Sequence, residues 1–328
     1  MSPSSPPSQS SLAAGAPEAS VVIACYNAQD FLEKAVQSAF AQRGVEVEVI
    51  VIDDHSTDQS YALAQRLAAR DARVRVLQTP SNCGPGGARN VGIAAMRGEW
   101  YCVLDCDDLM LPDRLRTLID AAKMTNADLI ADDLIVFGDD HEEHRHCETI
   151  SGTPPRTLSL EDYFEATQMF GTKPNLGFLK PLIHRRVLVE AGHRYREDLQ
   201  IGEDDELMVQ LLLAGFRYVV TSDALYRYRK HDASISHRLS AKNSERMLSS
   251  EEHVRACVSA ADRESAAYRA RFASIQDAVA FSRAVEALKE RRWTAAISEM
   301  SRRPLSVRHF SMPIASQWNR LRARLGSS

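Results

Sequence analysis

The fold is decided by residues 47–58, which read Val-Glu-Val-Ile-Val-Ile-Asp-Asp-His-Ser-Thr-Asp. The first half is a short β-branched run, and such a run predicts a buried strand. In the second half, Ser56, Thr57 or Asp58 can cap a helix that we expect to reach about Arg70. The stretch therefore predicts a strand and a helix joined by a polar turn, which is the repeating unit of an α/β protein.

The same alternation extends to both sides of this stretch. Further strands are expected at residues 20–24, 74–77, 100–104 and 129–136, and helices at 31–39, 88–97 and after Pro112. The Gly-Pro-Gly-Gly run at 84–87 is expected as a turn before the helix. Apolar strands that alternate with helices predict a Rossmann-like, mostly parallel sheet flanked by helices.

The second half of the chain has a looser pattern. After about Asp139 we expect loops and short elements, followed by a helix near 206–214, a strand near 216–220 and mostly helix from 243 to 292. We divide the 328 residues into a disordered tail (1–19), a main domain (20–240) and a helical, basic C-terminal extension (241–328). The main domain has a first half (20–138) and a second half (139–240).

The composition limits the class of protein. With 44% hydrophobic and 26% charged residues and a net charge of −4, the chain is typical of a soluble protein and not of a nucleic-acid binder. Its six cysteines form no CxxC pair, which favours reduced thiols. The composition of residues 1–20 is not that of a signal peptide, and because no run of roughly 18 apolar residues occurs in the sequence, we expect no membrane-spanning segment. We therefore expect a cytoplasmic protein.

Polar side chains follow three of the predicted strands: Asn27, the pair Asp53-Asp54, and the run Asp105-Cys106-Asp107-Asp108. Because ligands bind at the carboxyl ends of parallel strands, we expect these groups at one edge of the sheet. Asp105 and Asp107, two residues apart, can hold Mg²⁺ or Mn²⁺. The alternative for these acids is a solvated turn.

Two further motifs carry charge. The Gly-rich run 82–92 is neither a Walker loop nor a dinucleotide fingerprint, but it places Arg89 at a helix start, where it can contact a nucleotide or pair with a nearby acid as a surface residue. Residues 202–206 read Gly-Glu-Asp-Asp-Glu before an apolar helix. Some of these acids complement the helix dipole, and one can act as a general base.

Taken together, these runs resemble the family 2 inverting glycosyltransferases of bacterial polysaccharide biosynthesis, which have the GT-A fold. The resemblance covers about residues 20–237, and its motifs occur in the family's order at 21–27, 49–58, 82–92, 105–115, 202–205 and 228–236. The run 228–231 reads Tyr-Arg-Lys-His. One departure is His55, where the family usually has Gly, so we expect a less tight turn there.

The resemblance implies roles on the donor side. Tyr26 would stack on the nucleotide base, with Asn27 beside it, and Asp54 would accept the imide N–H of the base. Arg89 would lie near the base or the ribose. His231 would approach the diphosphate.

It also implies the residues that carry the chemistry. Asp107 would bind Mn²⁺ or Mg²⁺ on the diphosphate, and Asp105 would contact the ribose or the metal. Asp204 would be the general base, supported by Glu203 or Asp205. The implied reaction is a single displacement from a nucleotide-sugar, by default a UDP-sugar, to a carbohydrate or lipid-linked glycan acceptor. The acceptor side is expected to involve residues 175–182.

Three alternatives are weighed against this interpretation. A sugar nucleotidyltransferase usually has a Gly-rich loop after the first strand, whereas residues 25–28 here read Cys-Tyr-Asn-Ala. A signalling receiver domain would be much shorter. An inactive homologue that only binds a nucleotide-sugar is disfavoured by the presence of both Asp107 and Asp204.

The last 28 residues are basic. Residues 301–328 contain six arginines and no acid, with apolar side chains interleaved. Such a segment can lie on anionic lipid, or it can pack on the domain with a solvated basic face. The sequence thus predicts a cytoplasmic enzyme that is either free or peripheral on the inner face of the membrane.

Overall fold

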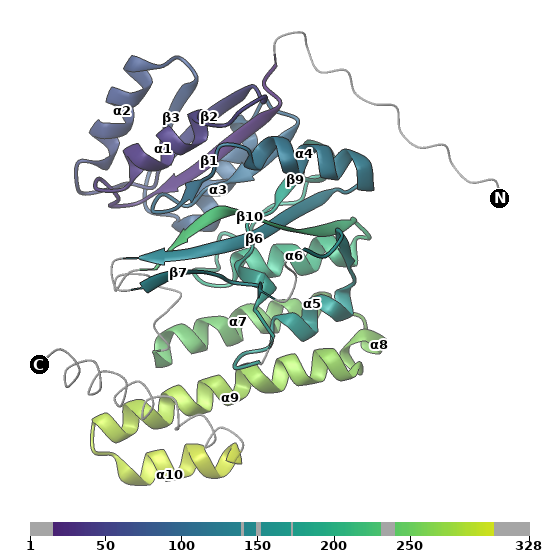
Figure 1. Ribbon diagram of the computed structural model, residues 1–328. Helices are drawn as coiled ribbons and strands as arrows, with labels where there is room; N and C mark the ends of the chain where they lie inside the picture. Colours follow the sequence, from purple (N-terminus) through teal and green to yellow (C-terminus); the bar gives the residue numbers. More distant parts are fainter. Residues whose placement is uncertain (1–15, 139–140, 149–151, 172, 231–239, 305–328) are drawn as a thin grey trace, which may run out of the picture.

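The computed structural model describes residues 16–138, 141–148, 152–171, 173–230 and 240–304 (Figure 1). One mixed sheet runs through the main domain in the order β3-β2-β1-β4-β9-β6-β10-β5. Its strands are β1 (Ala19–Cys25), β2 (Val47–Asp53), β3 (Val74–Gln78), β4 (Trp100–Val103), β5 (Leu109–Met110), β6 (Leu129–Gly138), β9 (Leu182–His184) and β10 (Tyr218–Arg229). Two short strands, β7 (His141–Arg145) and β8 (Arg156–Leu158), pair with β6 and β10.

The first four predicted strands form the parallel part of this sheet. β1 pairs in parallel with both β2 and β4, and β2 pairs in parallel with β3. Every residue of β2 is buried, as expected for a strand covered on both faces. Beyond β4 the sheet is mixed, because β9 runs antiparallel between β4 and β6, while β6 and β10 are parallel.

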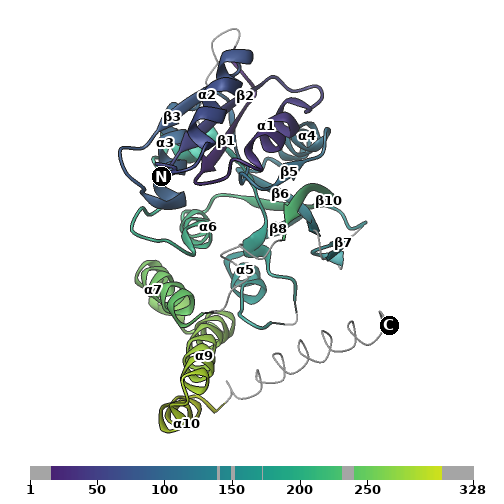
Figure 2. The same cartoon turned by 90° about the vertical axis from the view of Figure 1, so that its left-hand side faces the viewer.

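Helices cover both faces. They are α1 (Leu32–Phe40), α2 (Ser60–Arg70), α3 (Gly84–Ala95), α4 (Arg114–Thr125), α5 (Leu160–Ala166), α6 (Glu203–Leu213), α7 (Ala241–Cys257), α8 (Ala260–Arg263), α9 (Ala266–Lys289) and α10 (Trp293–Arg302), with the short 3-10 helix η2 (Leu176–Phe178) and the short π-helix η3 (Arg186–Glu190). In Figure 2, α1 and α4 lie on one side of β1 and α3 lies on the other. The predicted α/β fold with a helical extension is therefore confirmed.

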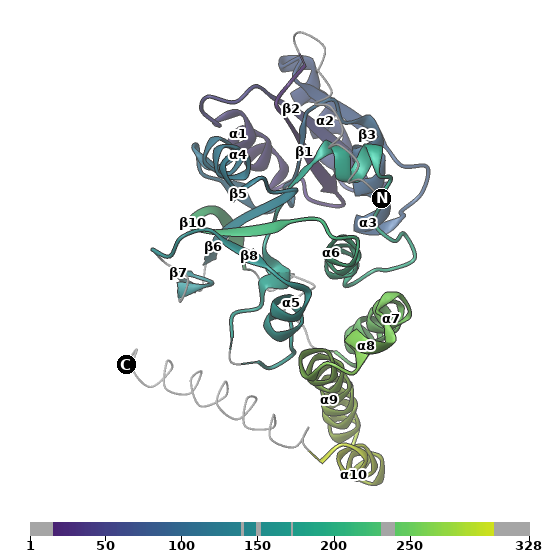
Figure 3. The same cartoon turned by 90° about the vertical axis from the view of Figure 1, so that its right-hand side faces the viewer.

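The C-terminal helices form a separate layer. Figure 3 shows α6 between the sheet and the pair α7 and α9, with α10 farthest from the sheet. No helix among the described residues is both long and apolar enough to cross a membrane. His231 and the basic segment 305–328 lie outside the described residues, as do residues 1–15 of the predicted tail.

The prediction of a turn at residues 84–87 is wrong, because α3 begins at Gly84. The glycines allow this helix to lie directly on the neighbouring chain. A Cβ at Gly92 would lie 2.4 Å from Val22 Cγ1, and one at Gly86 would lie 2.9 Å from the carbonyl oxygen of Arg196. Only glycine permits such an approach, so the run packs α3 against β1 and the loop before α6.

The expectation of a less tight turn at His55 is also wrong. His55 adopts φ +63°, the left-handed conformation that favours glycine. Its side chain is exposed, so a substitution there changes little besides the backbone preference.

We expect His55→Gly to raise the free energy of unfolding by about 0.5–1 kcal/mol, and His55→Val to lower it by about 1 kcal/mol or more. Glycine removes the left-handed strain but loses more chain entropy on folding, whereas a β-branched side chain increases the strain. Urea denaturation measures both values. The control is Gln59→Gly, at φ −83°, where glycine offers no relief. A His55→Gly variant less stable than the parent protein would contradict this account.

Candidate active site

The carboxyl ends of β1, β2 and β4 meet at one edge of the sheet, as predicted. Cys25 lies opposite Asp53 in the register of β1 and β2, and the backbone N–H of Asp54 donates to the carbonyl of Cys25 at 2.8 Å. The turn that begins at Asp105 follows β4, on the other side of β1. The predicted donor-side residues that follow these three strands therefore share one rim.

Asn27 and Asp53 brace the loop that follows β2. Asn27 has φ +51°, and its side-chain oxygen accepts the backbone N–H of Thr57 at 2.8 Å. Asp53 Oδ2 accepts the backbone N–H of Ser56 at 3.2 Å and the side-chain amide of Gln78 at 3.0 Å. These bonds leave the neighbouring Tyr26 at the rim, where 50% of the residue is exposed.

The Asp54 carboxylate is held at the N-terminus of α3. Its Oδ1 accepts from Thr79 Oγ1 at 2.8 Å and from the backbone N–H of Cys83 at 2.9 Å, and its Oδ2 accepts from the backbone N–H of Gly84 at 2.9 Å. A negative charge is favourable at this helix end. Asp54 is only 3% exposed, so its orientation is fixed before any ligand arrives.

A cluster of five charged side chains, of which Arg89, Lys180 and Glu203 are buried, lies at the centre of the site. Arg89 Nη1 lies 2.8 Å from Glu203 Oε1 and 2.9 Å from Asp204 Oδ1, and its Nη2 lies 2.9 Å from Asp105 Oδ1. Lys180 Nζ lies 2.8 Å from Asp105 Oδ2 and 3.6 Å from Asp204 Oδ2. The predicted donor-side residue Asp105 and the predicted base Asp204 therefore both contact the side chains of Arg89 and Lys180. Arg89 is 4% exposed, which places it inside the site and not on the surface.

The cluster fixes the charges of its members. Burial alone would raise the pKa of Asp105, but the positive charges of Lys180 and Arg89 outweigh it and hold that pKa well below its usual range. Burial alone would lower the pKa of Lys180, whereas Asp105 and Asp204 raise it. Burial and the charge of Asp204 raise the pKa of Glu203. At neutral pH, Asp105 is ionised and Lys180 is protonated.

The turn at residues 105–108 is anchored to β10. The Tyr226 hydroxyl accepts the backbone N–H of Asp105 at 3.2 Å and donates to Asp108 Oδ2 at 2.8 Å. Asp108 is 1% exposed and also accepts the backbone N–H of Arg229 at 2.6 Å. Asp107 is half-buried, and its carbonyl accepts from Arg229 Nε at 2.9 Å. Buried Asp108 thus anchors the turn that carries the half-buried Asp105 and Asp107.

At this turn, Asp107 is the carboxylate that would hold a divalent cation. Both oxygens of Asp105 are paired with the side chains of Arg89 and Lys180, and the half-buried Asp107 lies two residues further along the same turn. Within the described ranges, no group of three or more His, Cys, Asp or Glu side chains is arranged so that it could hold a metal ion by itself. A divalent cation held here by one carboxylate would take its other ligands from the phosphates of a bound substrate, as Mg²⁺ commonly does.

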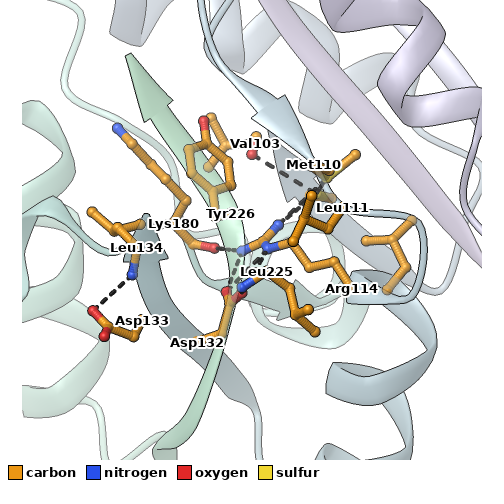
Figure 4. A network of polar contacts seen from close by, with 12 residues as sticks. Val103, Met110, Leu111, Arg114, Asp132, Asp133, Leu134, Lys180, Leu225 and Tyr226 are labelled. Atoms are coloured by element: carbon orange, nitrogen blue, oxygen red, sulfur yellow. Dashed lines mark hydrogen bonds and ion pairs between the residues drawn. The ribbon is translucent and has the colours of Figure 1, made fainter. Parts of the chain in front are cut away.

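The sequence analysis did not single out Lys180, although it lies in the stretch 175–182 that was expected on the acceptor side and one signal was present. It is a single charged residue in the apolar run 178–183, Phe-Leu-Lys-Pro-Leu-Ile, and a buried ammonium requires a partner. Its carbonyl accepts from Arg114 Nη2, and the guanidinium of Arg114 also pairs with Asp132 (Figure 4). This network fixes the backbone from which Lys180 reaches the site.

Asp205 points to a different set of partners. Its Oδ1 accepts from the Tyr163 hydroxyl at 3.0 Å, and its Oδ2 lies 2.5 Å from Arg271 Nη2. Arg271 belongs to α9 and is 3% exposed. The sequence analysis also missed Arg271, because nothing in a long helix shows which basic residue is buried. The roles predicted for Tyr26, Asn27, Asp54 and the acids of α6 stay predictions.

Comparison with known proteins defines the class. The model of glycosyl transferase family 2 matches residues 20–185. The succinoglycan biosynthesis protein ExoO of Rhizobium meliloti (strain 1021) is 37% identical over 308 residues, which are 94% of this chain and 88% of ExoO. The chain therefore belongs to glycosyl transferase family 2 and is a glycosyltransferase.

Solved structures agree on the fold. S. aureus TarS 1–349 in complex with UDP-GlcNAc has a TM-score of 0.60 at 17% identity, over 88% of this chain and 92% of that one. The mannosyltransferase PcManGT from Pyrobaculum calidifontis, in complex with GDP-Man and Mn²⁺, has a TM-score of 0.58 at 14% identity, over 92% and 81%. Together with the family match, these similarities confirm the predicted GT-A fold.

Proposed function

We propose that this glycosyltransferase transfers a sugar, with inversion, from a UDP-sugar to a carbohydrate or lipid-linked glycan in bacterial polysaccharide biosynthesis. The observation that carries the proposal is that Asp204 and Asp105 both pair with the side chains of Arg89 and Lys180. It puts the predicted base directly beside the predicted donor-binding turn. The printed name of ExoO supports a polysaccharide as the product.

In the proposed mechanism, Asp204 takes the proton of an acceptor hydroxyl. Its side chain is 30% exposed, so a hydroxyl can reach it. The acceptor oxygen attacks the anomeric carbon from the face opposite the nucleotide. The bond from that carbon to the diphosphate oxygen breaks, and its electron pair leaves with the diphosphate. Arg89 holds the orientation of Asp204 during this step.

The donor side of the proposal rests on two residues. Tyr26 offers an exposed ring for stacking on the base. Asp54 Oδ2 accepts one hydrogen bond, from Gly84, and a carboxylate oxygen has a second lone pair for the imide N–H of a uracil. TarS, with its bound UDP-GlcNAc, is consistent with a UDP-sugar, although PcManGT binds GDP-Man.

A divalent cation, Mn²⁺ or Mg²⁺, is part of the proposal, with Asp107 as its protein ligand. When bound, it neutralises the charge that develops on the departing diphosphate. The predicted contact of His231 with the diphosphate lies outside the described residues. We place the enzyme in the cytoplasm, either free or peripheral on the membrane through its basic C-terminal segment.

The test is release of nucleotide from a panel of UDP- and GDP-sugars with Mn²⁺, with Mg²⁺ or with EDTA. We expect one UDP-sugar to be hydrolysed slowly without acceptor, in a reaction that EDTA stops. Asp107→Ala should lower the rate by about 100-fold or more, because the cation loses its protein ligand. The control is Asp120→Ala on α4, whose side chain is 57% exposed.

Each other outcome has a distinct meaning. If no donor is hydrolysed and calorimetry detects no binding, the transferase proposal fails. Binding without turnover, even with glycan acceptors added, would favour the inactive homologue. Activity that persists in EDTA would remove only the cation from the proposal.

A further inference from the structure

The first turn of α6 carries Glu203, Asp204 and Asp205 and is held from two directions. Arg89 of α3 binds the first two acids from the side of the sheet. Arg271 of α9 binds Asp205 from the side of the C-terminal extension. Figures 2 and 3 both show α6 between these two parts of the molecule.

The contact with the extension uses the whole Asp205 carboxylate. Arg271 Nη1 lies 3.2 Å from Asp205 Oδ1, which also accepts from the Tyr163 hydroxyl, and Arg271 Nη2 lies 2.5 Å from Oδ2. The same guanidinium binds Glu251 Oε2 of α7 at 2.7 Å and the hydroxyl of Thr167. Arg271 and Glu251 are 3% and 1% exposed. Asp205 is thus bound directly by α5 and α9 and, through Arg271, is linked to α7.

A second contact lies just before the acids. Ser250 Oγ of α7 donates to the carbonyl of Gly202 at 3.2 Å. Gly202 has φ +83°, and a Cβ there would lie 2.8 Å from Ser250 Oγ. The extension therefore contacts the residues on both sides of the pair Glu203-Asp204.

Electrostatics explains why such contacts are needed. Four consecutive acids, Glu203 to Glu206, repel one another, and the helix dipole offsets only part of that repulsion. A buried ion pair is a weak source of stability compared with apolar packing, but its geometry is specific. A general base must be held within about 0.5 Å of its productive position. Fixing Asp205 fixes the rotation of the turn that carries Asp204.

We propose that Arg271 is a positioning residue for catalysis: through Asp205, it holds the α6 turn so that Asp204 faces the donor site. This inference rests on the proposed role of Asp204 as the base. It makes the helical extension a part of the active site, although the extension follows the segment that the family model matches.

The test compares two mild variants with a matched control. Arg271→Lys keeps the charge but cannot bind Asp205, Glu251 and Thr167 together, and Tyr163→Phe removes one hydrogen bond to Asp205. The control is Arg283→Met, which breaks an exposed pair with Glu245 between the same helices α9 and α7. Transfer kinetics and calorimetric donor affinity are measured well below the melting temperature of every variant.

We expect kcat to fall about tenfold in Arg271→Lys and about threefold in Tyr163→Phe, because a misplaced base slows the proton transfer. The donor KM and Kd should stay within about twofold of the parent values, and the control should be unchanged. In an Asp204→Asn background, Arg271→Lys should have no further effect on kcat.

Three results would overturn the inference. The first is an unchanged kcat in Arg271→Lys. The second is a loss of donor affinity large enough to explain the whole loss of activity in that variant. The third is a fall in kcat, when Arg271→Lys is added to Asp204→Asn, as large as the fall that Arg271→Lys causes in the parent protein. The two proposals fail separately. If Asp204→Asn is fully active, the assignment of the base fails; if Asp204→Asn is inactive and Arg271→Lys is normal, only the positioning role fails.

Discussion

Asp204→Asn is expected to lower kcat by about 10²- to 10⁴-fold, the usual contribution of a general base. Asparagine has the same shape, and its side-chain oxygen can still accept from Arg89, so the cluster should keep its geometry. The loss should therefore appear in kcat, with the donor Kd nearly unchanged. Transfer rates under saturating donor and calorimetry with the same donor measure the two quantities.

The control for this variant is Asp198→Asn, which changes an exposed acid in the loop before α6. It should keep full activity. If Asp204→Asn retains a third or more of the parent kcat, the base lies elsewhere. Glu203→Gln is then the next variant, since Glu203 shares the same arginine.

The largest loss of stability is expected from Arg114→Met, at about 3–5 kcal/mol in the free energy of unfolding. Arg114 and Asp132 are completely buried, and Arg114 Nη2 lies 2.9 Å from Asp132 Oδ1 (Figure 4). Burial raises the pKa of Asp132 even with Arg114 present. Removal of the guanidinium leaves that carboxyl and the carbonyl of Lys180 without their charged donor. Urea denaturation measures the loss.

The double variant Arg114→Met/Asp132→Asn should recover about 1–3 kcal/mol of that loss, because no buried charge then lacks a partner. Asparagine can still accept the backbone N–H of Leu225, which now donates to Asp132 Oδ2 at 2.9 Å. The control is Arg116→Met on the same helix, which breaks partly exposed pairs and should cost at most about 1 kcal/mol. Strictly additive effects of the two single substitutions would contradict the ion-pair explanation.

The parallel part of the sheet could be predicted from the sequence, and so could the grouping of polar residues at the carboxyl ends of its strands. Apolar runs such as 47–52 have one physical solution, a strand buried on both faces, and the acids that follow such strands must then share an edge. The acids at 203–206 were likewise predicted next to an apolar helix that was expected to begin near residue 206. They form the first turn of that helix, α6, which begins at Glu203.

The partners of the charged residues could not be predicted. Arg89 and Glu203 are 114 positions apart in the sequence, and nothing in the sequence around either residue indicates that their side chains form an ion pair. Arg271 lies in a helix whose other charged residues include both the exposed Arg269 and the buried Asp277, so its burial depends on how α9 packs on α5 and α7. β9 has three residues, too few for a periodic signal, and its place between β4 and β6 is set by tertiary contacts.

The position of β9 has a mechanical consequence. It comes from the second half of the main domain, yet its backbone is hydrogen-bonded on one edge to β4 and on the other to β6. The two halves consequently share one continuous ladder, and swinging them apart about a hinge would break it. The sheet therefore holds the two halves of the main domain at a fixed distance from each other. Any opening that admits the proposed sugar nucleotide must then come from loops at the strand ends.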